Sequence, residues 1–294
     1  IKEQFSKYTQ YLSVASVFMY ATQAAKSMFE QVKLIDSAMT ELKKVTNETN
    51  ESYNEFLTNA ATRSREIGTT IDVFVKSTAD FARLGYGFED AQGLAEVANI
   101  YAVVGDEVEG VEGATESLIS TMAAFKNEMN EMDGMNNADF AMSIIDIYNE
   151  LGNNFAISSG GLGEALERSA SSLAAANNTL HESAALITAA NTVVQNPEKV
   201  GTAFKTISMR IRGAKTELEE AGESTEGMVE STANLRAEIM ALSGVDIMLN
   251  ANEFKSTYQI MDELAAKWKD LSDIQQATII ELMAGKHQGN VFAS

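Results

Sequence analysis

Apolar positions recur with the period of an α-helix along most of this chain. From Phe5 to Leu42 an apolar or small residue stands at every third or fourth position, with no glycine or proline between them. This spacing places one apolar stripe along a single helix. A continuous helix from Ile1 to Lys44 would be about 65 Å long at ~1.5 Å per residue. Such a helix is either a coiled-coil arm or a long helix lying on the body of the protein.

A polar run, TNETNES at residues 46–52, interrupts this stripe and predicts a turn or hinge. We therefore expect two parts: a long helix or coiled-coil arm over residues 1–48, and a compact multi-helical body over residues 49–294. Shorter amphipathic segments follow the hinge, and few stretches alternate with the period of a strand, so the predicted fold is all-α. The helices expected are one capped by Thr69 or Thr70 and ending at Gly85, then Phe88–Val104, Val111–Lys126, Ala138–Leu151, Ser158–Asn178, Leu235–Leu242, Tyr258–Trp268 and Ile274–Ala284.

The segment from Ser183 to Gly213 contains the only proline of the chain and predicts two helices that meet at a sharp joint. Asn196 interrupts the first apolar stripe, since a residue that precedes proline is driven out of the α region. Pro197 suits the first turn of a new helix, whose amide needs no partner. A second stripe follows and ends at Gly213, a normal helix stop. Asn196, Pro197, Gly201 and Gly213 are the residues assigned to this joint.

Small residues dominate the predicted helix over Ser158–Asn178, which we place in the crowded interior beside the joint, because alanine, serine and glycine let backbones approach closely. After Gly213 the sequence becomes strongly acidic up to about residue 230, and we expect this stretch to be exposed and partly mobile. The run VDIMLNANEF, residues 245–254, predicts a loop or a short extended piece.

The charge balance narrows the range of partners. Among 294 residues, 22 are basic and 42 acidic, which gives a net charge of −20. This disfavours direct nucleic-acid binding and nonspecific binding to an anionic membrane surface. The chain has no cysteine, so it forms neither disulfides nor thiolate metal sites. It begins with Ile rather than Met, and a helical pattern continues to its last residues, so we expect a fragment truncated at both ends.

No catalytic, cofactor or metal site is expected from the residue patterns. His181 and His287 stand far apart, each without a partner at helical metal-site spacing. Glu164 and Glu167 are typical of a solvated helix face rather than an acid/base pair. The glycine motifs GYG and SSGGLG lack the lysine ending of a phosphate loop and are interpreted as helix ends and starts.

A basic island stands out against the acidic composition. Its members are Lys199, Lys205, Arg210, Arg212 and Lys215, opposed within the span only by Glu198. In one interpretation Arg210 and Arg212 complement the dipole at a helix C-terminus and pair with the glutamates nearby. In the other, the five residues are interaction candidates that form a docking face for an acidic partner surface. The sequence leaves both open.

Four runs in a fixed order carry a further signal. They are DVFVK…VVGD at residues 72–106, ISSGGLGEALERSASSLAAANN at residues 157–178, the stretch at residues 182–222 that contains NPEKVGTAFKTISMRIRG, and IIELMAGKHQGNVFA at residues 279–293. Together they resemble the core region of the lactococcal-type phage tail tape measure proteins, in which a similar N-P-x-x-V-G-T-A-x-K-T-I-S-x-R-I-R-G string occurs. Each run alone is only an amphipathic helix, and their order makes the resemblance specific.

The resemblance implies a non-enzymatic structural protein that scaffolds tail tube assembly, occupies the tube lumen and is released at infection, ahead of DNA ejection. It implies as partners the tail tube protein, distal tail or tail-tip proteins and tail assembly chaperones. It further implies a homo-oligomer, with a trimer favoured, located in the virion tail lumen or tail tip and in the host cytoplasm during assembly. Phage and prophage origins both stay open.

Two other functions remain alternatives. In the first, the protein is membrane-active, and the small-residue helices between Gly160 and Val194 unpack and insert into the host envelope to assist DNA passage. In the second, it is a muralytic enzyme, although the sequence shows no matching catalytic pattern.

Overall fold

The computed structural model describes residues 23, 26–132 and 134–294. Helices dominate this part of the chain, and the only extended pairing within it is an isolated antiparallel bridge between Met248 and Phe254. The all-α prediction is confirmed. The predicted amino-terminal helix is observed over residues 26–45, whereas most of its first half lies outside the described residues, so its full length and its coiled-coil character stay predictions.

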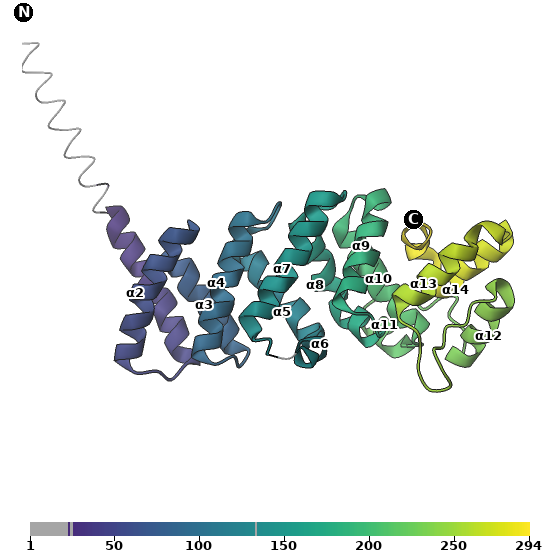
Figure 1. Cartoon of the computed structure of the whole chain (residues 1–294), viewed down its shortest axis with the longest axis horizontal. Helices are drawn as coiled ribbons and strands as arrows, with labels where there is room; N and C mark the ends of the chain where they lie inside the picture. Colours follow the sequence, from purple (N-terminus) through teal and green to yellow (C-terminus); the bar gives the residue numbers. More distant parts are fainter. Residues whose placement is uncertain (1–22, 24–25, 133) are drawn as a thin grey trace, which may run out of the picture. The chain divides into compact units, whose positions relative to one another are not determined.

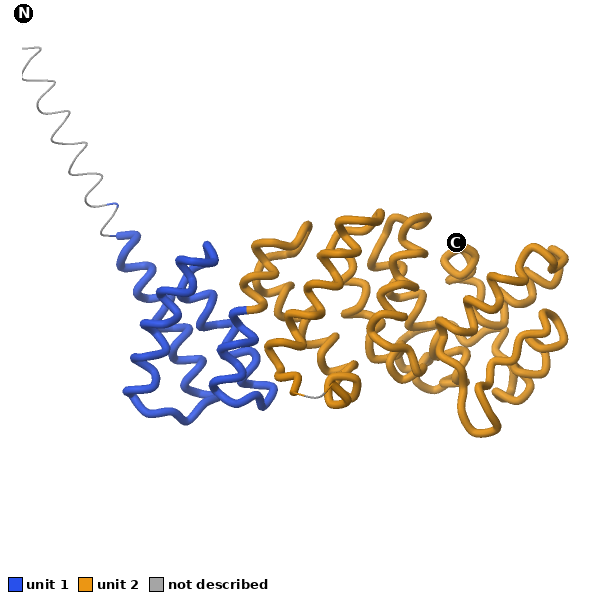
Figure 2. Tube along the Cα trace, in the orientation of Figure 1, with its two compact units in different colours: residues 1–96 blue, residues 97–294 orange. Residues whose placement is uncertain are grey.

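The chain divides into two compact units, residues 1–96 and residues 97–294 (Figure 2). The first unit contains the helix over residues 26–45, α2 (Asn50–Ile67), α3 (Ile71–Arg83) and the start of α4 (Phe88–Val104). Its core includes Met39 and Leu42, so the end of the amino-terminal helix packs into this unit. The domain boundary predicted after residue 48 stays a prediction.

Helix α2 is missing from the sequence prediction. The polar run does form a turn, but only over residues 46–49, and α2 begins at Asn50 with the Thr49 side chain accepting a hydrogen bond from the amide of Ser52. Most of α2 is polar. Its buried residues, spaced three or four apart, are Tyr53, Phe56, Ala60 and Ser64. Only two of its large apolar side chains, Tyr53 and Phe56, are buried, and they form too weak a stripe to recognise.

The second unit contains the remaining helices (Figure 1). They are α5 (Gly110–Ala124), α6 (Lys126–Glu131), α7 (Asn137–Asn154), α8 (Ser159–Ala175), α9 (Leu180–Val194), α10 (Pro197–Ile211), α11 (Lys215–Glu220), α12 (Thr232–Ser243), α13 (Thr257–Lys267), the 3-10 turn η1 (Trp268–Asp270) and α14 (Asp273–Phe292). The small-residue helix α8 packs against α5, α7, α9 and α10, which confirms its predicted place in the interior next to the joint.

Two local predictions need correction. No helix is expected between Lys126 and Ala138, whereas α6 lies in this link. The acidic stretch after Gly213 contains α11, in which Leu218 is fully buried, so this stretch is only partly exposed. The helix predicted to end at Ala284 does break at the next residue, Gly285, whose φ of 69° and ψ of −177° are not helical, and a further helical stretch continues to Phe292.

Candidate functional site

The joint between α9 and α10 is a capped helix start. Asn196 has extended backbone geometry, and its side-chain Oδ1 accepts a hydrogen bond of 2.8 Å from the amide of Lys199. Pro197 occupies the first helical position, where the missing amide hydrogen costs nothing. The preceding residue, Gln195, ends α9 in the left-handed conformation. The chain therefore reverses between two helices within the two residues Gln195 and Asn196.

One turn into α10, Gly201 lies against the backbone of α8. A Cβ atom at Gly201 would come within 2.4 Å of the carbonyl oxygen of Ala165 and 2.8 Å of its Cα. Helix α8 contributes a second glycine contact at the joint, because a Cβ at Gly161 would lie 2.8 Å from Cγ of Pro197. Glycine at both positions lets the two helices cross more closely than any larger residue permits.

Arg210, in the last turn of α10, is the most distinctive residue of the predicted basic island. Its side chain is buried, with 2% of the residue exposed. The guanidinium donates to four backbone carbonyls: Nε to Leu282 at 3.4 Å, Nη1 to Ser224 at 3.1 Å, and Nη2 to Glu226 at 3.1 Å and to Glu281 at 3.0 Å. We call this set of contacts the Arg210 clasp.

The clasp joins two segments that are distant in sequence. Glu281 and Leu282 stand just before the break at Gly285, so their carbonyls are at the end of a helical stretch, where a cation is favoured. Ser224 and Glu226 belong to the acidic loop after α11. Burial lowers the pKa of Arg210, while the Glu281 carboxylate raises it. The planar guanidinium group of arginine suits this arrangement, because its five N–H donors can bind carbonyl oxygens on several sides at once.

The glycine at the break fits closely over the guanidinium. A Cβ at Gly285 would lie 3.1 Å from Nη1 and 3.2 Å from Cζ of Arg210. The φ of Gly285 is also one that side chains rarely adopt. The clasp and the helix break therefore depend on each other.

Arg212, two residues later, binds a different segment. Its Nη2 donates to the carbonyl of Lys255 at 3.1 Å, and its Cζ lies 4.4 Å from the ring centroid of Phe254. Burial lowers the pKa of Arg212 to about 10. Because the cation stacks on an aromatic face and binds a carbonyl, it fixes the loop that leads into α13.

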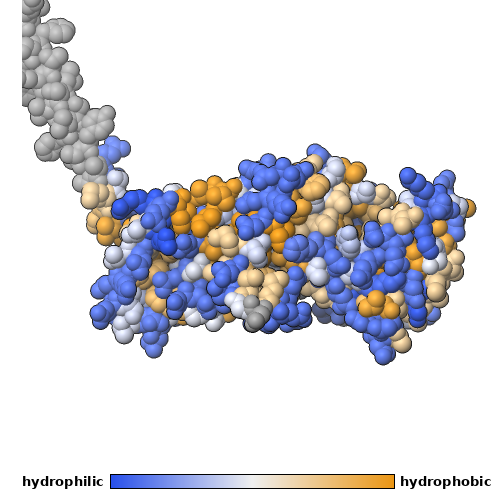
Figure 3. Space-filling model, in the orientation of Figure 1, coloured by the Kyte–Doolittle hydropathy of each residue, from blue (hydrophilic) through white to orange (hydrophobic). Residues whose placement is uncertain are grey.

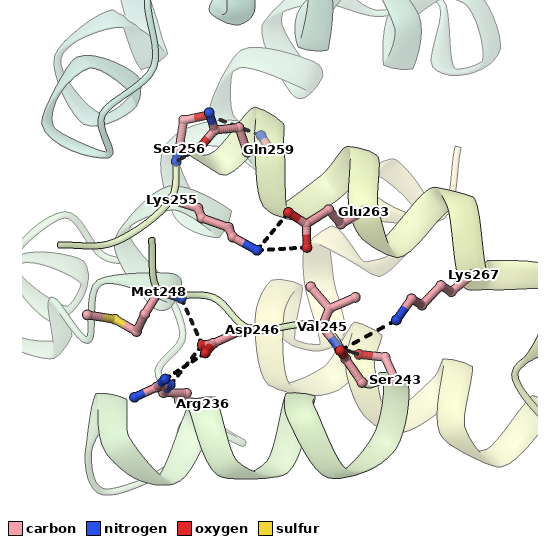
Figure 4. A network of polar contacts seen from close by, with 11 residues as sticks. Arg236, Ser243, Val245, Asp246, Met248, Lys255, Ser256, Gln259, Glu263 and Lys267 are labelled. Carbon is pink, nitrogen blue, oxygen red and sulfur yellow. Dashed lines mark hydrogen bonds and ion pairs between the residues drawn. The ribbon is translucent and has the colours of Figure 1, made fainter. Parts of the chain in front are cut away.

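A polar network also holds this loop (Figure 4). Arg236 of α12 binds both carboxylate oxygens of Asp246, at 2.7 and 2.6 Å, and Lys255 binds both oxygens of Glu263 of α13, at 2.6 and 2.8 Å. The amide of Met248 also donates to Asp246 at 3.0 Å. Opposite charge and hydrogen bonding from Arg236 lower the pKa of the Asp246 carboxyl. The loop between α12 and α13 is thus tied to three helices: α10, α12 and α13.

The structure separates the five interaction candidates into two groups. Arg210 and Arg212 bind backbone of their own unit, and they reach carbonyls rather than the glutamate carboxylates that the first interpretation expected. Lys199 and Lys215 are exposed and Lys205 is half-buried. The docking face for an acidic partner stays a prediction, and of the five residues these three lysines could contact such a partner. Gly213 ends α10 with a φ of +69°.

The apolar stripe of α10 indicates that Arg210 is buried, although its charge suggests an exposed residue. Arg210 follows Ile207 by three positions and directly precedes Ile211, so it lies on the buried stripe of α10. A cation on such a stripe needs internal partners. The docking interpretation, which rests on charge alone, placed all five residues on one surface.

Two further observations concern the described residues only. Among them, no group of three or more histidine, cysteine, aspartate and glutamate side chains is placed to hold a metal ion. In the same residues, no helix has both the length and the apolar character needed to cross a bilayer. His181 and His287 are both exposed.

Fold and site define an all-helical protein whose distinctive arginines bind its own backbone. Residues 58–285 match the family model described as phage-related minor tail protein, and this span is more than three-quarters of the chain. The chain therefore belongs to the phage-related minor tail protein family, a family of structural tail proteins that associate with other tail components in the virion. No solved structure matches the chain significantly.

Proposed function

We propose that this chain is the core region of a tail tape measure protein, which scaffolds tube assembly, occupies the tube lumen and leaves it at infection. The main support for the proposal is the order of the four sequence runs that resemble the tape measure proteins. Three of them, at residues 72–106, 157–178 and 182–222, lie entirely within the span that matches the tail protein family, and the fourth overlaps its end. The tail tube protein, distal tail or tail-tip proteins and assembly chaperones are the proposed partners.

The runs also coincide with the packing centre of the second unit. The run at 157–178 forms α8, and the run at 182–222 supplies most of α9, all of α10 and, within it, Arg210, the donor of the Arg210 clasp. Gly201 and Arg210 both belong to the string that carries the resemblance, and both make contacts that a substitution would disturb. The shared string is therefore best explained as a packing requirement, which supports a shared core rather than a shared active site.

Self-association through the amino-terminal helix is part of the proposal. On this helix Met39 and Leu42 are buried in the first unit, whereas Met28, Phe29 and Val32 are exposed, Phe29 by 68%. Such an uncovered apolar stripe on an extended helix is what a coiled-coil partner covers. A parallel homo-oligomer, with a trimer favoured, is the expected assembly.

The experiment compares tails before and after DNA ejection. Virions of the phage or induced prophage that encodes this chain are purified, and ejection is triggered in one half. Quantitative mass spectrometry then measures this chain relative to the tail tube protein. We expect a fixed ratio in full tails, a loss of most of the chain after ejection, and no regular tails from a nonsense mutant. An unchanged ratio after ejection, or regular tails without the chain, contradicts the proposal.

The membrane-active alternative makes a different prediction. Helices α8 and α9 form part of the core of the second unit, with Leu166, Leu173 and Ile187 buried, so insertion requires this unit to unpack. Leakage of dye from vesicles of host lipid, measured with the purified chain, tests this alternative independently of the ejection experiment.

A further inference from the structure

Three methionines recur at intervals of three residues where α6 ends. Met129 belongs to α6, Met132 is its C-cap, and Met135 follows shortly before α7. Three of the 14 methionines of the chain thus fall within residues 129–135. The thioether sulfur of methionine is a soft ligand that favours Cu(I), whereas Mg²⁺ and Ca²⁺ favour oxygen ligands.

Two backbone hydrogen bonds bring these methionines together. The amide of Met132 donates to the carbonyl of Met129 at 3.1 Å, and the amide of Met135 donates to the carbonyl of Met132 at 3.3 Å. Each bond closes a turn of four residues, whose first and last Cα atoms lie within about 7 Å of each other. Gly134, in the second turn, has a φ of 77°, which a residue with a side chain rarely adopts. Met132 is therefore one turn away from both of the other methionines.

The neighbouring structure holds both ends of this segment. Before it, Phe125 is buried, and the carboxylate of Glu128 accepts a hydrogen bond of 2.9 Å from the amide of Leu180 at the start of α9. After it, Oδ1 of Asn136 accepts a hydrogen bond of 2.8 Å from the amide of Asp139 and so caps α7. Fixed ends reduce the conformational entropy that the segment loses when its side chains gather around an ion.

The three methionines are within reach of solvent. Met132 is 37% exposed, and Met129 and Met135 are half-buried. Near α6, the space-filling view shows apolar surface among hydrophilic side chains (Figure 3). Core packing buries a methionine fully, as it does Met122 and Met283. The unbranched side chain has three rotatable bonds, so its sulfur can turn toward an ion without a shift of the backbone.

We propose that Met129, Met132 and Met135 form a binding site for Cu(I), held by their three sulfur atoms. Cu(I) has a filled d shell and imposes no strict geometry, which suits ligands carried on two successive turns. The chain has no cysteine, so thioethers are its only sulfur ligands. Its net charge of −20 favours the approach of a cation. The site is separate from the Arg210 clasp and does not depend on the tail function.

Competition with a coloured Cu(I) chelator measures the binding, with the full chain and with ascorbate present to keep the copper reduced. We expect the chain to withdraw a single ion from the chelator, and an excess of Mg²⁺ to leave that ion in place. The variant that combines Met129→Leu, Met132→Leu and Met135→Leu keeps the side-chain volumes but removes the sulfur atoms. It should bind Cu(I) about tenfold more weakly or not at all.

The matched control combines Met209→Leu, Met240→Leu and Met261→Leu on three other helices. These residues too are one exposed and two half-buried methionines, and the control should bind Cu(I) like the natural chain. Both variants keep His181 and His287, so any copper bound by an imidazole is common to the two. Equal binding by the two variants, or displacement of the ion by Mg²⁺, overturns the proposal.

A second measurement uses the natural chain and Ag(I), an ion as soft as Cu(I). Hydrogen peroxide oxidises exposed thioethers to sulfoxides, and a sulfur atom bound to a metal is shielded from this reaction. Peptide mass spectrometry then gives the oxidation rate of each methionine. With Ag(I) present, Met129, Met132 and Met135 should oxidise several-fold more slowly, whereas the exposed Met28 and Met240 should react at an unchanged rate. Equal protection of all five methionines, or no protection of the first three, contradicts the site.

Discussion

Gly201 and Ala165 mark the closest approach between α10 and α8: the carbonyl oxygen of Ala165 lies only 2.4 Å from the position that a Cβ of residue 201 would take. The clash involves backbone atoms, so no rotamer change relieves it. Helix α8 is enclosed by α5, α7, α9 and α10, and it cannot shift without disturbing these contacts. The absent side chain at residue 201 thus determines how the two central helices of the second unit cross.

From this contact we predict that Gly201→Ala destabilises the protein although alanine is the better helix former. The expected loss in the free energy of unfolding is about 1–3 kcal/mol, the usual cost of overpacking a core. Chemical denaturation monitored by circular dichroism measures it. Gly87→Ala is the control, since nothing lies within 4 Å of its Cβ position and its φ is ordinary, and it should change stability little. Equal effects of the two substitutions would refute the close-crossing argument.

The Arg210 clasp gives a second prediction. Replacing Arg210 by methionine keeps the buried aliphatic volume but removes the donors to four carbonyls, and we expect a loss of roughly 3 kcal/mol. Arg210→Lys should not rescue stability, because a compact ammonium cannot reach both segments. The acidic loop should also become more sensitive to a glutamate-specific protease near Glu226. Lys199→Met, an exposed substitution on the same helix, is the control and should be nearly neutral. A stable, protease-resistant R210M variant would show that the clasp contributes nothing.

Periodicity predicted the fold more fully than it predicted the site. The joint at Pro197 and the bounds of α4 follow from local rules on proline, capping and apolar spacing, which act within a few residues. Helix α2 was not predicted because most of its residues are polar and only Tyr53 and Phe56 among its large apolar side chains are buried. The helix end at Ala284 was predicted, but the contact between Gly285 and Arg210 was not, because the two residues are 75 positions apart in the chain.

The partners of the site residues could be predicted from the sequence even less than the helices could. The sequence reveals that Arg210, Arg212 and the neighbouring lysines are unusual in an acidic chain, but not which of them face water. Arg210 is buried because carbonyls from residues 224–226 and 281–282 converge on it, and that convergence is a property of the tertiary structure. Charge pattern identified the residues, whereas long-range packing assigned their partners.

The ion pair between Arg236 and Asp246 predicts a dependence of stability on pH. The pKa of Asp246 is lowered in the folded protein, so its charged form stabilises the fold above the ordinary pKa of about 3.9. This contribution is lost as the pH falls through the lowered folded-state pKa. Asp246→Asn should therefore cost up to about 1 kcal/mol at pH 7, and the difference from the natural protein should vanish in acid. Glu238→Gln, an exposed change on α12, is the control in the same denaturation series. A difference that persists unchanged to pH 2 contradicts this origin.

The docking hypothesis is best tested on the two exposed lysines, Lys199 and Lys215, together with the half-buried Lys205. Because Arg210 supports the fold, its removal would confuse loss of binding with loss of structure, so the test variant neutralises Lys199, Lys205 and Lys215 to glutamine. The triple variant should bind tails that have lost the natural chain through DNA ejection several-fold more weakly at low salt. The difference should disappear near 1 M salt, where the screening length is only ~3 Å. Replacing Lys26, Lys33 and Lys126, which are also exposed, makes the same change in net charge elsewhere and serves as the control. If both triple variants weaken binding equally at every salt concentration, total charge rather than a docking face governs the association.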